Sequence, residues 1–394
     1  MLSFLYIFQL INNWPKMLLI SWNSLISAPE PPVLIKVNFL SDTTPHVWST
    51  ENDVINRKSV VELSICDFSN SPTSTYFWEV FAENESAPDI TKSTNSCSIE
   101  LRLSKMTTHH IKLTINRNTR QLHRLETTIP KQSTFWLAAI GDSFSSGQGN
   151  PDVARNGDEK ARWMNESCYR SIHSFPYQTY LQLPNSTILT FLSCSGVTVE
   201  NGILSKNGQL EHLRRLISKN GQKPPDALVL TIGGNDIGFS DIIANLQDGS
   251  TISSIDMRFF YVSHQLDQLA AKLVEMRISK VILVDYYDVT RNEKGDVDGS
   301  CGLFGQVSTT NLQLAEKQVL RRLNYLLLKK SIQYGWTIIH TFDIFAKHGL
   351  CSKSSLIRSI NESISLQGNS FGAFHPNQIG HKLISEKVLK VLNA

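Results

Sequence analysis

Five short, continuous apolar runs in the last two thirds of the chain constrain the fold most strongly. They have the length and the branched side chains of strands that are buried on both faces. The runs are Phe135 to Ile140, Ile188 to Leu192, Ala227 to Ile232, Val281 to Val284 and Thr337 to Ile339. Helical periodicity lies between several of them, most clearly over Ile255 to Met276 and Leu312 to Ile332. The alternation predicts an α/β fold, in which helices cover both faces of a parallel sheet.

Composition limits the size of the core, the number of domains and the class of partner. The chain has 394 residues, of which 41% are hydrophobic and 19% charged, so it can bury a large core and we expect more than one domain. The net charge of +3 comes from 38 basic and 35 acidic residues without a long run of one sign. This pattern argues against a nucleic-acid partner.

Residues 32 to 130 have a different pattern. Apolar and polar side chains alternate over Ser59 to Ile65 and over His110 to Ile115, as they do in half-buried strands. Cys66, Trp78 and Cys97 follow in an order that is typical of small two-sheet sandwiches. The segment resembles an immunoglobulin-like or polycystic-kidney-disease-type β-sandwich. We expect an accessory domain without chemistry of its own, and a carbohydrate or protein docking surface is the alternative.

The amino end and the cysteines both favour export. Residues 1 to 31 are apolar but interrupted by polar residues and a proline, so they make a poor membrane span and are better interpreted as a signal sequence. An uncleaved anchor remains the alternative. Six cysteines without a CxxC pair are typical of disulfides. Asn-X-Ser/Thr tripeptides predict glycosylation at Asn84, Asn165, Asn185 and Asn361. We therefore expect a secreted glycoprotein.

Small and polar residues follow three of the apolar runs, at the sheet edge where α/β proteins bind ligands. The segments are Gly141-Asp142-Ser143, Cys194-Ser195-Gly196 and Gly233-Gly234-Asn235-Asp236. A fourth segment, Phe374-His375-Pro376-Asn377, precedes an amphipathic helix.

These four segments resemble the four signature blocks of the SGNH (GDSL-like) hydrolases. The resemblance covers about Phe135 to Ala394, and we expect the hydrolase domain to span residues 131 to 394. It implies a flavodoxin-like three-layer fold, with Ser143 as nucleophile and His375 as general base. A serine hydroxyl needs such a base because it is a poor nucleophile at neutral pH, and imidazole titrates in the right range. The family pattern also implies an oxyanion hole made by the backbone N–H groups of Ser143 and Gly196 and the side-chain amide of Asn235.

Structural roles are the alternatives for these residues. Ser143 could be a helix N-cap, Gly196 a turn glycine, Asn235 an Asx-turn residue and His375 a structural histidine. We expect the neighbouring Asp142 and Asp236 to organise their loops, and His381 to be structural.

The chain departs from the family pattern at one position. The family usually has an aspartate three residues before the histidine, but Gly372 stands there. Some members of the extracellular branch use a backbone carbonyl instead, so we expect the carbonyl of Phe371, Gly372 or a close neighbour to orient His375. Asp343, reaching in from another strand, is the alternative.

The resemblance is closest to the branch of extracellular lipases, esterases and phospholipases A1. It implies the disulfides Cys66–Cys97, Cys168–Cys194 and Cys301–Cys351. We predict a monomeric enzyme that cleaves carboxylic esters of lipids, phospholipids or small acyl compounds without a metal or cofactor. A glycan O-deacetylase and a catalytically silent binding or adhesion protein are the alternatives. Four phenylalanines could line an acyl pocket or pack in the core: Phe144, Phe239, Phe304 and Phe374.

Overall fold

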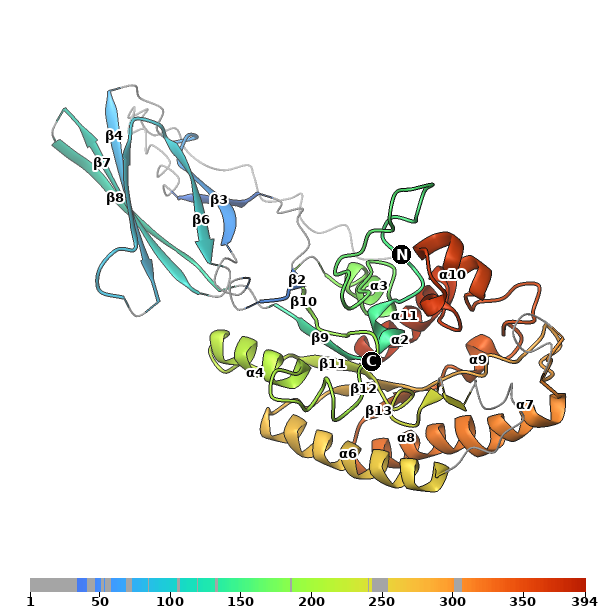
Figure 1. Ribbon diagram of the computed structural model, residues 1–394. Coiled ribbons are helices and arrows are strands. Elements are labelled where there is room, and N and C mark those ends of the chain that lie inside the picture. Colours follow the sequence, from blue (N-terminus) through green and yellow to red (C-terminus); the bar gives the residue numbers. More distant parts are fainter. Residues whose placement is uncertain are drawn as a thin grey trace, which may run out of the picture.

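The computed structural model describes most of the chain from residue 34 onward (Figure 1). The described ranges are 34–40, 47–50, 53, 58–68, 73–83, 85–104, 107–118, 120–131, 134–184, 186–239, 241–242, 254–300 and 307–394. The predicted signal segment, Asn84, Asn185, Cys301 and Phe304 lie outside them. No helix within these ranges is both long enough and apolar enough to cross a membrane.

The N-terminal region is built from two antiparallel sheets, with strand orders β1-β3-β6 and β5-β4-β7-β8. The strands are β1 (Lys36–Phe39), β3 (Lys58–Ser64), β4 (Ser74–Ala82), β5 (Ile90–Thr94), β6 (Ser98–Ser104), β7 (His109–Arg117) and β8 (Arg120–Ile129).

Alternation along the strands gives these two sheets one shared core. Every second residue of β4 is buried, and the buried set includes Trp78. Trp78 belongs to one apolar cluster with Leu63 of the first sheet and Leu113 of the second. The disulfide Cys66–Cys97 ties the end of β3 to the start of β6. The predicted β-rich region is therefore present, while its likeness to immunoglobulin or polycystic-kidney-disease domains stays a prediction.

A six-stranded parallel sheet with the order β13-β12-β11-β9-β10-β2 forms the centre of the second region. Its strands are β2 (Val47–Trp48), β9 (Trp136–Gly141), β10 (Ile188–Phe191), β11 (Ala227–Thr231), β12 (Val281–Val284) and β13 (Thr337–Ile339). Without β2, this is the flavodoxin-like order 2-1-3-4-5. The chain reverses direction across the sheet between β9 and β11, where such folds bind ligands.

Helices cover both faces of this sheet (Figure 1). α4, α6 and α8 pack on one face, and α3, α9 and α11 on the other. The helices are α2 (Ser143–Ser146), α3 (Phe175–Leu181), α4 (Gln209–Lys219), α6 (Ile255–Glu275), α7 (Thr309–Ala315), α8 (Arg321–Tyr334), α9 (Phe342–Phe345), α10 (Ile360–Gln367) and α11 (Gln378–Leu392), with a π-helical turn at Glu316–Leu320 and a 3₁₀ turn at Ser370–Gly372. The predicted flavodoxin-like three-layer fold with a parallel sheet is confirmed.

The strand β2 joins the two regions in a way that the sequence did not suggest. It comes from within residues 32–130, which we expected to form the β-sandwich alone, yet it pairs with β10 of the parallel sheet. Trp48 is only 2% exposed and contacts Trp136 edge to face, with ring centroids 5.2 Å apart. The edge of the α/β sheet is therefore completed by chain that precedes most of the β-rich region.

Replacing Trp48 tests this attachment. Trp48→Ala should lower the free energy of unfolding of the α/β region by about 3–5 kcal/mol, because it leaves a cavity beside Trp136. Differential scanning calorimetry measures the effect. Tyr325→Ala is the matched control, since Tyr325 is 70% exposed on α8. Equal melting temperatures for the two variants would contradict the packing role of β2.

Candidate active site

Ser143 lies on a tight turn between β9 and α2. Gly141 has a φ of +126°, and a Cβ at this position would lie 2.2 Å from the carbonyl oxygen of Thr231, so only glycine fits. The next residue, Asp142, caps α2 by accepting a hydrogen bond from the backbone N–H of Phe144 at 3.0 Å. Ser143 is thus the first helical residue, at the carboxyl edge of the sheet.

The imidazole of His375 contacts this serine although the two residues are 232 positions apart. Its Nε2 lies 2.7 Å from Ser143 Oγ, and its Nδ1 lies 2.9 Å from the carbonyl oxygen of Ala373. A carbonyl oxygen can only accept a hydrogen bond, so Nδ1 carries the proton of the neutral ring. Nε2 is then left to accept the hydroxyl proton of Ser143.

The hydrogen-bond acceptor for Nδ1 is the carbonyl of Ala373, a close neighbour of Phe371 and Gly372, the two residues that we named from the sequence. Phe374 has a left-handed backbone with a φ of 67°, which folds the chain back between Ala373 and the ring. The Gly372 carbonyl still contributes, because its hydrogen bond raises the pKa of His375. The Phe371 carbonyl accepts a hydrogen bond from Gln148 instead.

Contacts from three other segments hold the His375 loop. Arg358 donates its backbone N–H to the His375 carbonyl at 2.8 Å and accepts the Phe374 N–H at 2.9 Å. The Tyr287 hydroxyl donates to the Phe374 carbonyl at 2.8 Å. The side-chain amide of Asn150 donates to the Pro376 carbonyl at 2.8 Å. These contacts, which include an isolated antiparallel bridge between Ile357 and Pro376, hold the left-handed residue in place.

Desolvation decides the charge of His375. It lowers the pKa of His375 from 6.5 to about 4, although the carbonyls of Ala373 and Gly372 act in the opposite direction. The ring of Phe144 lies 5.1 Å from the imidazole and contributes to this apolar surround. At neutral pH the imidazole is uncharged and able to accept a proton.

Gly196 and Asn235 lie on the loops that follow β10 and β11, on either side of β9, the strand that leads to Ser143. Gly196 has a φ of +76°, and a Cβ there would meet open space, so its backbone faces an unfilled region. The Asn235 amide donates one hydrogen to the carbonyl of Val197 at 2.9 Å, which holds this side chain beside the Gly196 turn. An amide NH₂ has two hydrogens, so one remains for a ligand.

The acidic residues of these segments, Asp142 and Asp236, form hydrogen bonds with other residues of the protein. The Asp142 carboxyl accepts hydrogen bonds from Phe144 and Thr231 and contacts the Tyr286 hydroxyl, while Asp236 accepts the Val199 N–H at 2.8 Å. Burial raises the pKa of each carboxyl to about 6. These contacts are those of residues that organise loops.

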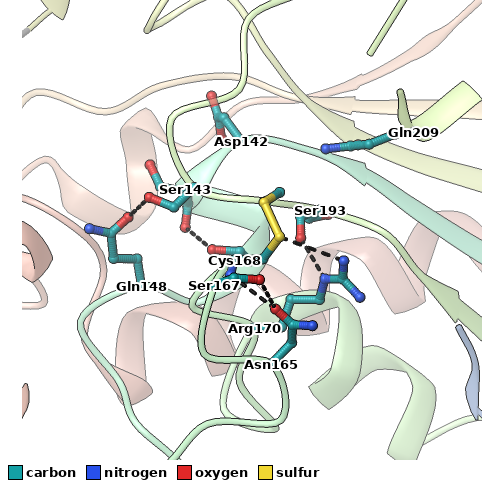
Figure 2. The surroundings of a disulfide bond; sticks show 12 residues. Asp142, Ser143, Gln148, Asn165, Ser167, Cys168, Arg170, Ser193 and Gln209 are labelled. Carbon is teal, nitrogen blue, oxygen red and sulfur yellow. Dashed lines mark hydrogen bonds between the residues drawn. A yellow bond between two sulfur atoms is a disulfide. The ribbon is translucent and has the colours of Figure 1, made fainter. Parts of the chain in front are cut away.

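A disulfide supports the loop that carries Gly196 (Figure 2). Cys168–Cys194 has the predicted pairing, and Arg170 donates to the Ser193 carbonyl at 2.9 Å beside it. Figure 2 also shows Asn165 next to Ser167, whose hydroxyl it accepts at 2.9 Å. Together with Cys66–Cys97, two predicted disulfides are present, while the third includes Cys301, outside the described ranges.

The remaining candidates lie around the site or away from it. Phe239 and Phe374 contact each other at 6.5 Å between ring centroids, whereas Phe144 packs against Tyr286 and Tyr287 at the core. His381 is buried and accepts the Phe175 N–H at 3.2 Å, which is a structural role.

Asp343 pairs with Lys387 rather than with His375. Within the described ranges, no group of three or more His, Cys, Asp or Glu residues could hold a metal ion.

Two glutamines that the sequence did not single out shape the site. Gln209 of α4 accepts the Gly141 N–H at 2.7 Å and donates to the Gly141 carbonyl at 2.9 Å, so it completes the end of β9. Gln148 contacts both the Ser195 hydroxyl and the Phe371 carbonyl. The only sequence signal for Gln148 is its place between Gly147 and Gly149, directly after the nucleophile's helix.

Two curated lipases and a solved lipase structure are similar to this chain. Lipase 1 of Streptomyces coelicolor is 25% identical over 269 residues, which cover 65% of this chain and 84% of the relative. A lipase of Streptomyces rimosus is 26% identical over 273 residues, 67% of this chain and 87% of the relative. The solved extracellular lipase from Streptomyces rimosus aligns with a TM-score of 0.44 and 23% identity, over 66% of this chain and 98% of that one.

A family model settles the membership. It describes the GDSL-like lipase/acylhydrolase family and matches residues 139–383, more than half of the chain, including all four blocks. The chain belongs to the GDSL-like lipase/acylhydrolase family and is a carboxylic ester hydrolase.

Proposed function

We propose that this protein is a secreted, monomeric lipase or esterase that uses a Ser143–His375 dyad. The observation that carries the proposal is the 2.7 Å contact between His375 Nε2 and Ser143 Oγ, with Nδ1 already occupied by the Ala373 carbonyl. This arrangement leaves the basic nitrogen facing the hydroxyl.

In the first half of the reaction, Nε2 takes the hydroxyl proton as Ser143 Oγ attacks the ester carbonyl carbon. The carbonyl π electrons move to the carbonyl oxygen and give a tetrahedral intermediate. When that intermediate collapses, the bond to the alcohol oxygen breaks and His375 returns its proton to the leaving alkoxide. The products of this half are an alcohol and an acyl-Ser143 ester.

In the second half, His375 accepts a proton from water while the water oxygen attacks the acyl carbon. The bond to Ser143 Oγ breaks, and the serine regains its proton from the imidazole. The carboxylic acid is released and the dyad is restored. No metal or cofactor takes part in either half.

Negative charge on the carbonyl oxygen needs donors that are already oriented toward it. We assign this role to the N–H groups of Ser143 and Gly196 and to the free amide hydrogen of Asn235. Among the described residues, neither backbone N–H donates a hydrogen bond to the protein. Each such donor is worth about 3 kcal/mol in the transition state.

Several features support secretion and an apolar substrate. Two disulfides suit an oxidising compartment. Asn361 is exposed in the first turn of α10, where a glycan can be accommodated, whereas the Asn165 side chain accepts hydrogen bonds from its own loop. Phe239 and Phe374 form an aromatic pair next to His375 that would contact an acyl chain. We therefore place lipid and phospholipid esters ahead of small soluble ones.

Removing the nucleophile tests the dyad. Ser143→Ala should abolish labelling by an organophosphonate probe and lower hydrolysis of nitrophenyl esters by about 10⁴-fold or more, because Ser143 supplies the hydroxyl that contacts His375 Nε2 in the described part of the chain. Ser205→Ala, an exposed serine, is the matched control. A chain-length series of esters beside acetylated xylan reports the substrate class. Labelling that persists in Ser143→Ala would refute the dyad.

The pH dependence follows from the partly buried and desolvated His375. Because the neutral ring accepts the proton and its pKa is lowered to about 4, kcat/KM should persist below pH 6.5 and fall as the pH drops through about 4. A pH–rate profile on a soluble ester measures this, with Asp236→Asn to identify any inflection from that carboxyl. An acid limb centred at 6.5 in both proteins would contradict the assignment.

Asp343 should be dispensable for turnover. Its carboxylate pairs with Lys387, and Nδ1 of His375 already has a backbone acceptor, so Asp343→Asn should leave kcat nearly unchanged. His375→Ala in the same assay shows how far kcat falls when the proposed base is removed. A loss in Asp343→Asn beyond about a hundredfold would show that a carboxylate completes a triad.

A further inference from the structure

We propose that Gln148 is a positioning residue that holds the oxyanion-hole loop and the histidine loop in register. The inference rests on the proposed Ser143–His375 function and extends it to a side chain that touches neither reacting group. Its amide bridges the two loops that must meet around the substrate carbonyl.

The two ends of the Gln148 amide make different bonds. Its Nε2 donates to the Phe371 carbonyl at 2.6 Å. Its Oε1 accepts the hydroxyl of Ser195, the residue directly before Gly196. A carboxamide is the side chain that can donate at one end and accept at the other without a charge. Gln148 is 4% exposed, so water is not a ready replacement for either partner.

Gln148 adds a side-chain anchor to each of the two bridged loops. Phe371 is 64% exposed, so its own packing holds it little, whereas the next residue, Gly372, donates its N–H to the Ser363 hydroxyl at 2.9 Å. The Phe371 carbonyl lies in the 3₁₀ turn that leads into Ala373, the acceptor of His375 Nδ1. On the other side, Gly196 has a left-handed φ. The bond from the Ser195 hydroxyl to Gln148 adds to the bond from the Ser195 N–H to the Cys168 carbonyl at 3.2 Å in holding the residue before Gly196.

The turn after α2, which carries Gln148, is in direct backbone contact with the turn before His375. This contact keeps the Gln148 bridge short and rigid. A Cβ on Gly372 would lie 2.5 Å from the Cα of Gly149, so the turn after α2 and the histidine turn touch without side chains between them. Arg358 also donates to the Gly149 carbonyl at 3.1 Å and to the Asn150 side chain at 2.9 Å. Because these contacts do not involve the Gln148 side chain, the fold should survive its replacement while the register of the loops loosens.

Gln148→Met removes both bonds and keeps the length of the side chain. We expect kcat to fall about 10- to 100-fold with a small change in KM, because misplacement of reacting groups by about 1 Å costs rate more than affinity. Ser195→Ala removes only one bond and should lower kcat less. The double variant should be no worse than Gln148→Met alone, since both changes remove the same contact.

Gln148→Glu separates positioning from stability through its pH dependence. An ionised carboxylate cannot donate to the Phe371 carbonyl and repels it, whereas the protonated acid can donate. The kcat of this variant relative to the unchanged protein should rise as the pH falls from about 8 to about 5, because burial raises the pKa of such a carboxyl into that window. His375 stays neutral over this range, so the base still works.

Gln178→Met is the matched control, since the Gln178 amide donates to the Ile172 carbonyl at 2.8 Å on α3. Calorimetry checks that all variants are folded, and organophosphonate labelling that depends on Ser143 checks the dyad itself. If labelling needs Ser143 but Gln148→Met and Gln148→Glu leave kcat unchanged, the positioning role of Gln148 is refuted and the proposed function stands. A kcat loss as large in Gln178→Met, or a Gln148→Glu ratio independent of pH, would also refute the positioning role. Labelling that does not need Ser143 would instead refute the proposed function.

Discussion

The hydrogen bonds that hold residues 374–376 are the constraint on which the site depends. Ser143 is placed by a strand and a helix, whereas His375 lies between a left-handed residue and a proline, outside any regular element. Its position depends on backbone bonds from Arg358 and side-chain bonds from Tyr287 and Asn150. Backbone strain of this kind persists only when the surroundings over-determine it. The distance between imidazole and hydroxyl is therefore a property of the whole cluster around the loop.

The electrostatics of the site follow from the missing carboxylate. Where an aspartate would balance an imidazolium with a full charge, the carbonyls of Ala373 and Gly372 supply only dipoles. They offset part of the desolvation that lowers the pKa of His375. The two carbonyls fix the tautomer of the neutral ring. They stabilise the charged imidazolium less than an aspartate would. We therefore expect His375 to be a weaker base that stays neutral, and so remains able to accept a proton, at lower pH.

Much of the architecture could be predicted because it depends on local patterns. The five apolar runs are the strands β9 to β13, and the predicted helix from Ile255 to Met276 matches α6 (Ile255–Glu275) within a residue. The blocks that contain Ser143, Gly196, Asn235 and His375 follow from the family resemblance together with the rule that ligands bind at strand ends. Their catalytic roles stay proposals.

Long-range pairings could not be predicted from one sequence. The acceptor of His375 depends on the left-handed φ of Phe374, which is rare for a non-glycine residue and has no sequence signal. Gln148 and Gln209 act through carbonyls distant in sequence, and neutral amides have no periodicity that would identify them. The pairing of β2 with β10 was missed because a two-residue strand is too short to show alternation.

That short strand has a consequence for how such a protein can be divided. A chain cut before residue 131 would keep every block of the active site but expose the flank of β10 and the face of Trp136. Unpaired backbone at a sheet edge favours association with other chains. The linear boundary between the two regions and their physical boundary therefore do not coincide. Exchanging the N-terminal region for another accessory module would succeed only if the graft kept the residues around Val47 and Trp48.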